Sequence, residues 1–259
     1  VDGDYNTAVG YKALEDYEDG DGNGHNTAIG NSSQLNASTG EFNTSLGSLS
    51  MGVGVTTGDN NVALGYNAAA VLTSGANNVM AGAYAGDALN SGTNNVGIGY
   101  GALSSEDTGG QNVAIGVNAL NTLNYDGNGL NVAVGYAAGA LMSTGTNNTL
   151  MGAFSGDALT TGDYNVAIGR SALSLEDAYG YNVAIGAFAL LSQNAADNAF
   201  NVAVGYNTGQ AITTGVQNVL MGGNAGDALT TGGKNVAIGH NALSTEDAHG
   251  NNVAIGYQA

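Results

Sequence analysis

A run of oxygen-bearing side chains near the N-terminus has the spacing of a calcium ligand set. Asp19, Asp21 and Asn23 alternate with glycine, which is how a calcium-binding loop begins. Position twelve of an EF-hand loop would fall on Gly30 instead of a glutamate, so an EF-hand is excluded. We predict a looser calcium site here, and calcium is the one candidate cofactor. The alternative is a solvated acidic loop with turn-forming glycine and asparagine.

Three tyrosines recur at a fixed interval. Tyr66, Tyr136 and Tyr206 each follow a repeated glycine and lie 70 residues apart. Exposed tyrosines could stack on sugars or contact a protein receptor, and we predict such a contact site here. The alternative is that each ring covers the corner of its own coil and packs against a neighbouring chain.

Catalytic groups are sparse. His25, His240 and His249 are the only histidines, and cysteine is absent. The histidines could serve as metal ligands or general bases. The simpler alternative is that they are solvated loop residues. The serines lack a histidine–carboxylate partner set, and the adjacent pair Glu176-Asp177 implies no glycosidase cleft. We therefore predict that the chain is not an enzyme.

The charge excludes several partners. The 259 residues include 21 acidic but only three basic side chains, for a formal net charge of −18. Binding nucleic acid or an anionic membrane needs clustered lysine and arginine, so neither is expected as a partner. No run of about 20 apolar residues is present, and no membrane insertion is expected in this segment. The absence of cysteine excludes a disulfide framework.

These side chains must be positioned by a short repeat. An asparagine followed four residues later by a glycine occurs fifteen times, as in Asn165-Val166-Ala167-Ile168-Gly169, and most repeats are 17 residues apart with the others at 18 to 20. Such regularity indicates a repeat architecture. Side chains alternate along a strand, so Val183 and Ile185 share one face, and Ala184 and Gly186 share the other.

We predict an all-β fold, a parallel β-solenoid or β-roll of about fifteen coils of 17–20 residues. Each coil would climb one strand spacing of about 4.8 Å. We expect one face of the strand to pack into the coil interior. The face dominated by alanine and glycine would then be open to close approach by another copy of the chain.

The repeated asparagines should stack in register. Side-chain amides stacked in this way form hydrogen-bonded ladders, and asparagine tolerates the left-handed backbone of a sharp corner. We predict a structural ladder at Asn61, Asn78, Asn95, Asn112, Asn131, Asn148, Asn165, Asn182, Asn201, Asn218, Asn235 and Asn252.

The sequence also has a longer period, which spans four coils. Residues 1–64 form irregular coils, and 65–134, 135–204 and 205–259 form 70-residue blocks of four coils, the last of them incomplete. The second coil of each block has a bulkier residue in the strand, Met80, Leu150 or Leu220. We expect a single solenoid repeat domain over 1–259 that is a segment of a longer chain.

The unit Asn165-Val166-Ala167-Ile168-Gly169, followed by Ser171-Ala172-Leu173, resembles the head repeat of YadA-like trimeric autotransporter adhesins. Similar repeats occur in phage tail fibres and other fibrous surface proteins. The resemblance implies a left-handed β-roll and an intertwined homotrimer. The coil here is longer than the family's usual coil, and the four-coil block is not typical of it.

Three functions fit these features. The first is a non-enzymatic adhesive fibre segment, extracellular at a cell surface or on a virion, whose loops bind a surface glycan or a protein receptor. The alternative is a self-assembling extracellular filament or sheath subunit. An ice- or surface-binding solenoid is the third, and it would need a regular threonine column. In the first two functions the main partner is another copy of the chain.

Overall fold

A computed structural model describes residues 5–17 and 24–259 of the chain. Its regular structure is entirely β, and the described residues contain no helix that could cross a membrane. Each strand is three residues long and lies between a repeated asparagine and its glycine. The strands are β1 (Thr7–Val9), β2 (Thr27–Ile29), β3 (Thr44–Leu46), β4 (Val62–Leu64), β5 (Val79–Ala81), β6 (Val96–Ile98), β7 (Val113–Ile115), β8 (Val132–Val134), β9 (Thr149–Met151), β10 (Val166–Ile168), β11 (Val183–Ile185), β12 (Val202–Val204), β13 (Val219–Met221), β14 (Val236–Ile238) and β15 (Val253–Ile255).

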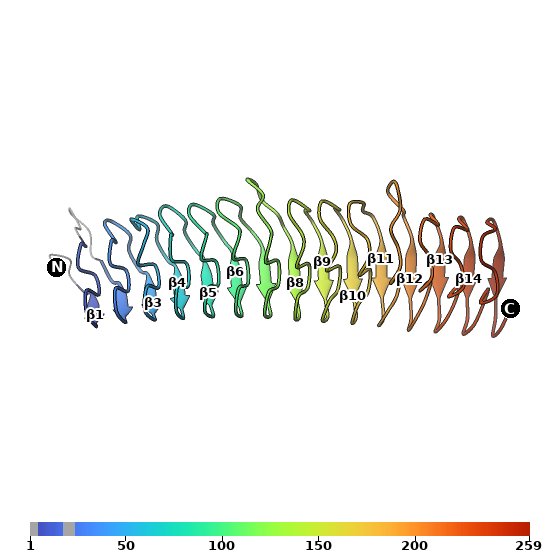
Figure 1. Cartoon of the computed structure of the whole chain (residues 1–259), viewed down its shortest axis with the longest axis horizontal. Helices are drawn as coiled ribbons and strands as arrows, with labels where there is room; N and C mark the ends of the chain where they lie inside the picture. Colours follow the sequence, from blue (N-terminus) through green and yellow to red (C-terminus); the bar gives the residue numbers. More distant parts are fainter. Residues whose placement is uncertain (1–4, 18–23) are drawn as a thin grey trace. The chain divides into compact units, whose positions relative to one another are not determined.

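The chain forms two compact units, an N-terminal unit (Val1–Leu130) and a C-terminal unit (Asn131–Ala259). Strands β1–β7 belong to the first and β8–β15 to the second. Within each unit every strand pairs in parallel with the next along the chain, and Ala167 lies opposite Ala184 in the register of β10 and β11. In Figure 1 the strands of each unit line one side of the coils, and the loops lie on the other side. This confirms the predicted all-β parallel solenoid in each unit.

The glycine after each strand forms a corner that needs the absence of a side chain. Gly169 has φ of 133°, a region that residues with a Cβ rarely adopt. A Cβ there would lie 2.5 Å from the backbone carbon of Gly186 in the next coil. The repeated asparagine was expected to adopt the left-handed backbone conformation, but the residue before it does so. Tyr164, with φ of 57°, takes it instead of Asn165.

The inward and outward faces of the strands are the reverse of the expectation. The middle residue points into the coil, and Ala167 and Ala184 are fully buried. Val166 and Ile168, on either side of Ala167, point outward and are half-buried. The interior is too narrow for large side chains on both walls, because leucines such as Leu173 fill it from the wall opposite the strand.

Where the strand carries a large interior residue, the opposite wall carries a glycine. Leu150 replaces the usual alanine, and Gly156 stands six residues later, where the next coil has Leu173. A Cβ at Gly156 would lie 2.9 Å from Leu150 Cδ2. Met80 with Gly86 and Leu220 with Gly226 repeat the exchange. A large interior residue on the strand is thus accommodated by removing the side chain opposite it.

The repeated asparagines link consecutive coils, mainly through the backbone. The main-chain N–H of Asn165 donates to Oδ1 of Asn148 at 2.9 Å, and that of Asn182 donates to Oδ1 of Asn165 at 3.1 Å. The side-chain nitrogen of Asn148 donates to the carbonyl of Gly162 at 2.8 Å, closing its own coil, and contacts Oδ1 of Asn131 at 3.2 Å. Each buried amide is therefore satisfied on both sides, as buried polar groups must be.

Candidate functional surface

The outward residues of the strands form one apolar surface in each unit, which we call the strand face. It consists of the first and third residues of every strand, β1–β7 in the N-terminal unit and β8–β15 in the C-terminal unit. Its valines are mostly half-buried by their neighbours, whereas Ile238 is 37% and Met221 43% exposed. Side chains of this kind are normally covered when they form a continuous patch.

The strand face carries no acidic residue. In each of the fifteen repeats, the seven residues from two before the strand to two after it contain no aspartate or glutamate, although the chain has 21 of them. Only Arg170 and Lys234 bring a full positive charge to its borders. Copies with a net charge of −18 repel one another at long range, and the strand face adds no acidic charge to that repulsion.

The size of the strand face suits an interface. Strands about 4.8 Å apart and three residues wide give on the order of 350–400 Å² for each unit. The strand face of one unit alone is thus about half of the roughly 800 Å² that each partner buries in a stable complex.

Exposed aromatic residues line the borders of the strand face. Tyr66, which is 45% exposed, packs edge-to-face on Tyr84 with ring centroids 5.4 Å apart. Tyr136 contacts Phe154 at 5.2 Å and Tyr206 contacts Phe188 at 6.1 Å. All three predicted contact tyrosines are therefore exposed and paired with a ring of an adjacent coil. The pairing supports the corner-covering role, and the exposure leaves part of each ring open to a ligand.

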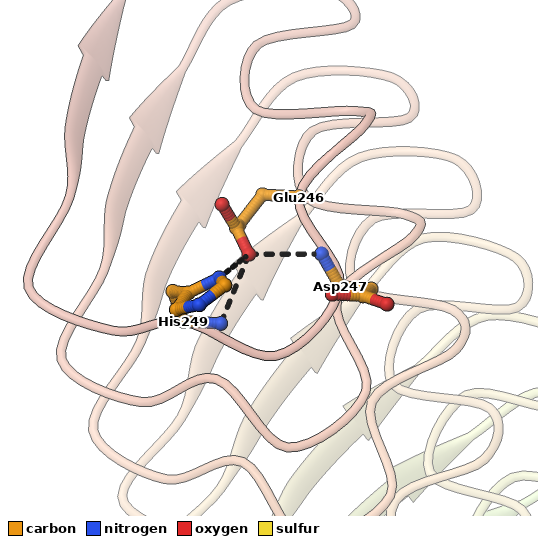
Figure 2. A group of neighbouring side chains, drawn as sticks. All are labelled: Glu246, Asp247 and His249. Carbon is orange, nitrogen blue, oxygen red and sulfur yellow. Dashed lines mark hydrogen bonds and ion pairs between the residues drawn. The ribbon is translucent and has the colours of Figure 1, made fainter.

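Glu246, Asp247 and His249 form a cluster of metal-type ligands in the C-terminal unit, with their ligand atoms all within 4.8 Å of one another. Figure 2 shows that one oxygen of Glu246 is the centre of the cluster. Oε1 accepts from the backbone N–H groups of Asp247 at 3.1 Å and His249 at 2.9 Å, and lies 2.9 Å from His249 Nδ1. The corresponding residues of the earlier blocks, Gly109 and Tyr179, cannot supply the histidine.

Electrostatics favour an ion pair within this cluster. The backbone hydrogen bond from His249 is the largest of the effects that lower the pKa of Glu246. The hydrogen bond to Glu246 raises the pKa of His249. A metal ion would have to displace the proton that this pairing holds on the imidazole. The arrangement therefore stabilises the turn from Glu246 to His249, although its side chains are of a type that divalent metals bind.

Two glutamates lie in the core. Glu106 and Glu176 are fully buried at a coil position that Leu89 and Leu159 occupy one coil earlier. Oε1 of Glu106 accepts from the backbone N–H of Gly109 at 2.7 Å, and burial raises the pKa of both carboxyls. The repeat carries a sign of this burial, because Glu176 holds the position that Leu159 has one coil earlier.

The predicted calcium ligands Asp19, Asp21 and Asn23 lie outside the described residues. Residues 5–17 and 24–259 form no pocket that could enclose a small molecule. Comparisons with protein-family models, with curated proteins and with solved structures found no match to this chain.

Proposed function

We propose that the chain is a non-enzymatic structural segment of an extracellular adhesive fibre, in which copies pack together through the strand face. The observation that carries this proposal is the strand face itself, which is apolar, half-exposed and free of acidic residues in a strongly acidic chain. Burying it would contribute about 25 cal/mol for each Å² of apolar surface removed from water.

The resemblance to YadA-like head repeats supports a homotrimer of left-handed coils. In such an assembly three strand faces would surround a common axis, and the loops would point outward. The acidic residues lie outside the strands and their flanks. Apart from the buried Glu106 and Glu176, the acidic loop residues would face solvent and keep the fibre soluble. The loops and the border tyrosines Tyr66, Tyr136 and Tyr206 would then be available to a surface glycan or a protein receptor.

An ice-binding role has less support. Such a surface would use rows of free threonine hydroxyls. The hydroxyls of Thr160 and Thr230 donate to the carbonyls of Asp177 at 2.7 Å and Asp247 at 2.9 Å. The threonines at these corners therefore hold consecutive coils together.

The absolute mass of the soluble chain, measured by light scattering after size exclusion, tests the proposal. Three times 25.5 kDa is expected for the trimer. Large heterogeneous species would favour the alternative, a filament or sheath that grows end to end. A monomer at every accessible concentration would overturn self-association through the strand face and direct attention to surface binding, beginning with ice.

A further inference from the structure

Tyr164 and Tyr181 occupy the same position in consecutive coils, immediately before a repeated asparagine. Their rings are stacked, with centroids 5.1 Å apart and an angle of 20° between the planes. Both are open to solvent, at 51% and 44% exposure. The column continues to Phe200, whose ring stacks on Tyr181 at 5.1 Å and 25°.

The composition makes these phenols conspicuous targets of oxidation. The chain has 13 tyrosines and no tryptophan or cysteine, so tyrosine is its main site for one-electron oxidation. Its five methionines react differently, because they gain an oxygen atom and become sulfoxides. We propose that Tyr164 and Tyr181 are an oxidative cross-linking site, where a peroxidase with hydrogen peroxide joins the two rings as dityrosine.

The reaction balances with one molecule of peroxide. Each phenol loses one electron and one proton to give a phenoxyl radical. The two radicals couple by forming a carbon–carbon bond between a Cε atom of each ring. The hydrogens on those two carbons then move to the phenol oxygens, which restores both aromatic rings. The chain loses two hydrogen atoms overall, and they reduce hydrogen peroxide to two molecules of water.

Stacking favours coupling of these two rings within one chain over coupling between chains. Two rings held on adjacent coils meet at a high effective concentration, so coupling within a chain outruns coupling between dilute chains. The backbone maintains the pairing, since the N–H of Tyr181 donates to the carbonyl of Asp163 at 3.1 Å. The bond would close a loop of one coil and hold β10 and β11 together, which restricts the unfolded chain as any cross-link does.

The aromatic pairs elsewhere make the prediction specific. Tyr181 with Phe200 and Tyr136 with Phe154 are equally close but contain only one phenol each, so they cannot form dityrosine. The edge-to-face pairs that Tyr84 makes with Tyr66 and with Tyr100, at 5.4 and 5.7 Å, have two phenols each and allow the same chemistry. Cross-links within the chain should therefore be confined to pairs of tyrosines on successive coils.

The test treats the full chain, dilute, with a peroxidase and hydrogen peroxide. Dityrosine fluorescence and intact mass under denaturing conditions report the reaction. Cleavage before aspartate then separates the two tyrosines, because Asp177 lies between them. We expect a chain of unchanged length, lighter by two hydrogen atoms, in which the peptides of Tyr164 and Tyr181 are joined. The cross-linked chain should also unfold at a higher temperature than the untreated chain.

Two variants make the test decisive. Tyr181→Phe keeps a stacked ring, as Phe200 shows that the column accepts phenylalanine, and should abolish this cross-link. Tyr206→Phe removes a tyrosine whose ring neighbour is Phe188, and should leave the cross-link unchanged. Tyr164→Phe serves if Tyr181→Phe does not fold by circular dichroism.

A cross-link at Tyr164 that survives in Tyr181→Phe would overturn the proposal. Dityrosine found only between chains, or at Tyr66, Tyr84 and Tyr100 without Tyr164, would do so as well. The bond lies within one chain, so the result does not depend on whether the strand face mediates assembly.

Discussion

Leu150 and Gly156 divide one layer of the core between them. Leu150 lies in strand β9 and points inward, and a Cβ on Gly156 would approach its Cδ2 to 2.9 Å. In the next coil the same two positions are held by Ala167 and Leu173, both fully buried. These two coils therefore fill the interior from opposite walls.

This exchange predicts strong coupling between the two positions. Leu150→Ala should destabilise the fold by about 2–5 kcal/mol by creating a cavity. Gly156→Leu should cost about 1–3 kcal/mol by overpacking. The double variant has alanine on the strand and leucine opposite it, as Ala167 and Leu173 do. It should recover part of both losses, with a coupling energy on the order of 2 kcal/mol, although Leu159 also borders position 156. Denaturant unfolding of the four chains measures the cycle.

The backbone does not oppose the leucine in this test. Gly156 has φ of 53°, and Leu173 already adopts φ of 54° at the same coil position. Additive effects of the two substitutions would show that the two walls do not share one packing space.

Aspartate on the two sides of a strand should have different consequences. Ala167→Asp places an unpaired charge in the core, which costs several kcal/mol and should prevent folding of a chain of ordinary marginal stability. Ile168→Asp points outward and should leave the β circular dichroism spectrum intact. Thr161→Asp, in an exposed loop, is the matched control for added charge. A folded Ala167→Asp chain would contradict the inward orientation of the alanine column.

The buried glutamates predict a dependence of stability on pH. Burial raises the pKa of Glu176, so the folded chain binds this proton more tightly than the unfolded chain. The free-energy contribution is then most favourable below the usual glutamate pKa of about 4.3, and it is lost as pH rises through the folded pKa. Glu176→Gln should raise the melting temperature at pH 7 and have little effect near pH 4.

Glutamine fits this site because Gln193 holds the same position in the following coil. The difference in melting temperature between Glu176→Gln and the parent chain, followed against pH, measures the effect. A difference that does not vary with pH would mean that the carboxyl is not desolvated in the folded chain.

The pairing of Glu246 with His249 in the C-terminal unit leads to a separate prediction. The hydrogen bond that the His249 ring donates to Glu246 raises the pKa of His249, so the imidazole should titrate above the usual histidine value of about 6.5. NMR titration of the His249 ring should show that Glu246→Gln lowers this pKa. An unchanged His249 titration in the variant would exclude the ion pair in solution.

The repeat made the strands predictable, because Asn-x-x-x-Gly marks both strand ends in every coil. It could not orient the strand, since Val166, Ala167 and Ile168 are all apolar and alternation alone fits either direction. The residues on the opposite wall of the coil supply the orientation. Leu150 with Gly156 and Leu220 with Gly226 change together, which shows that alanine, and not valine, faces the leucine wall.

The contacts of the charged residues in the loops were less predictable than the strands. Glu176 looks like half of a solvated carboxylate pair until it is aligned with Leu159 in the preceding coil. His249 approaches Glu246 only because the turn folds back within three residues. Such contacts depend on corner geometry, which short-range residue patterns do not specify.

The most direct test of self-association through the strand face is the mass of a chain whose face carries charge. Ile168→Asp and Ile185→Asp together place two carboxylates on adjacent strands without entering the core. Light scattering should give three times 25.5 kDa for the parent chain and a single 25.5 kDa for the folded double variant. A parent and a variant of equal mass would contradict the account, whichever mass they share.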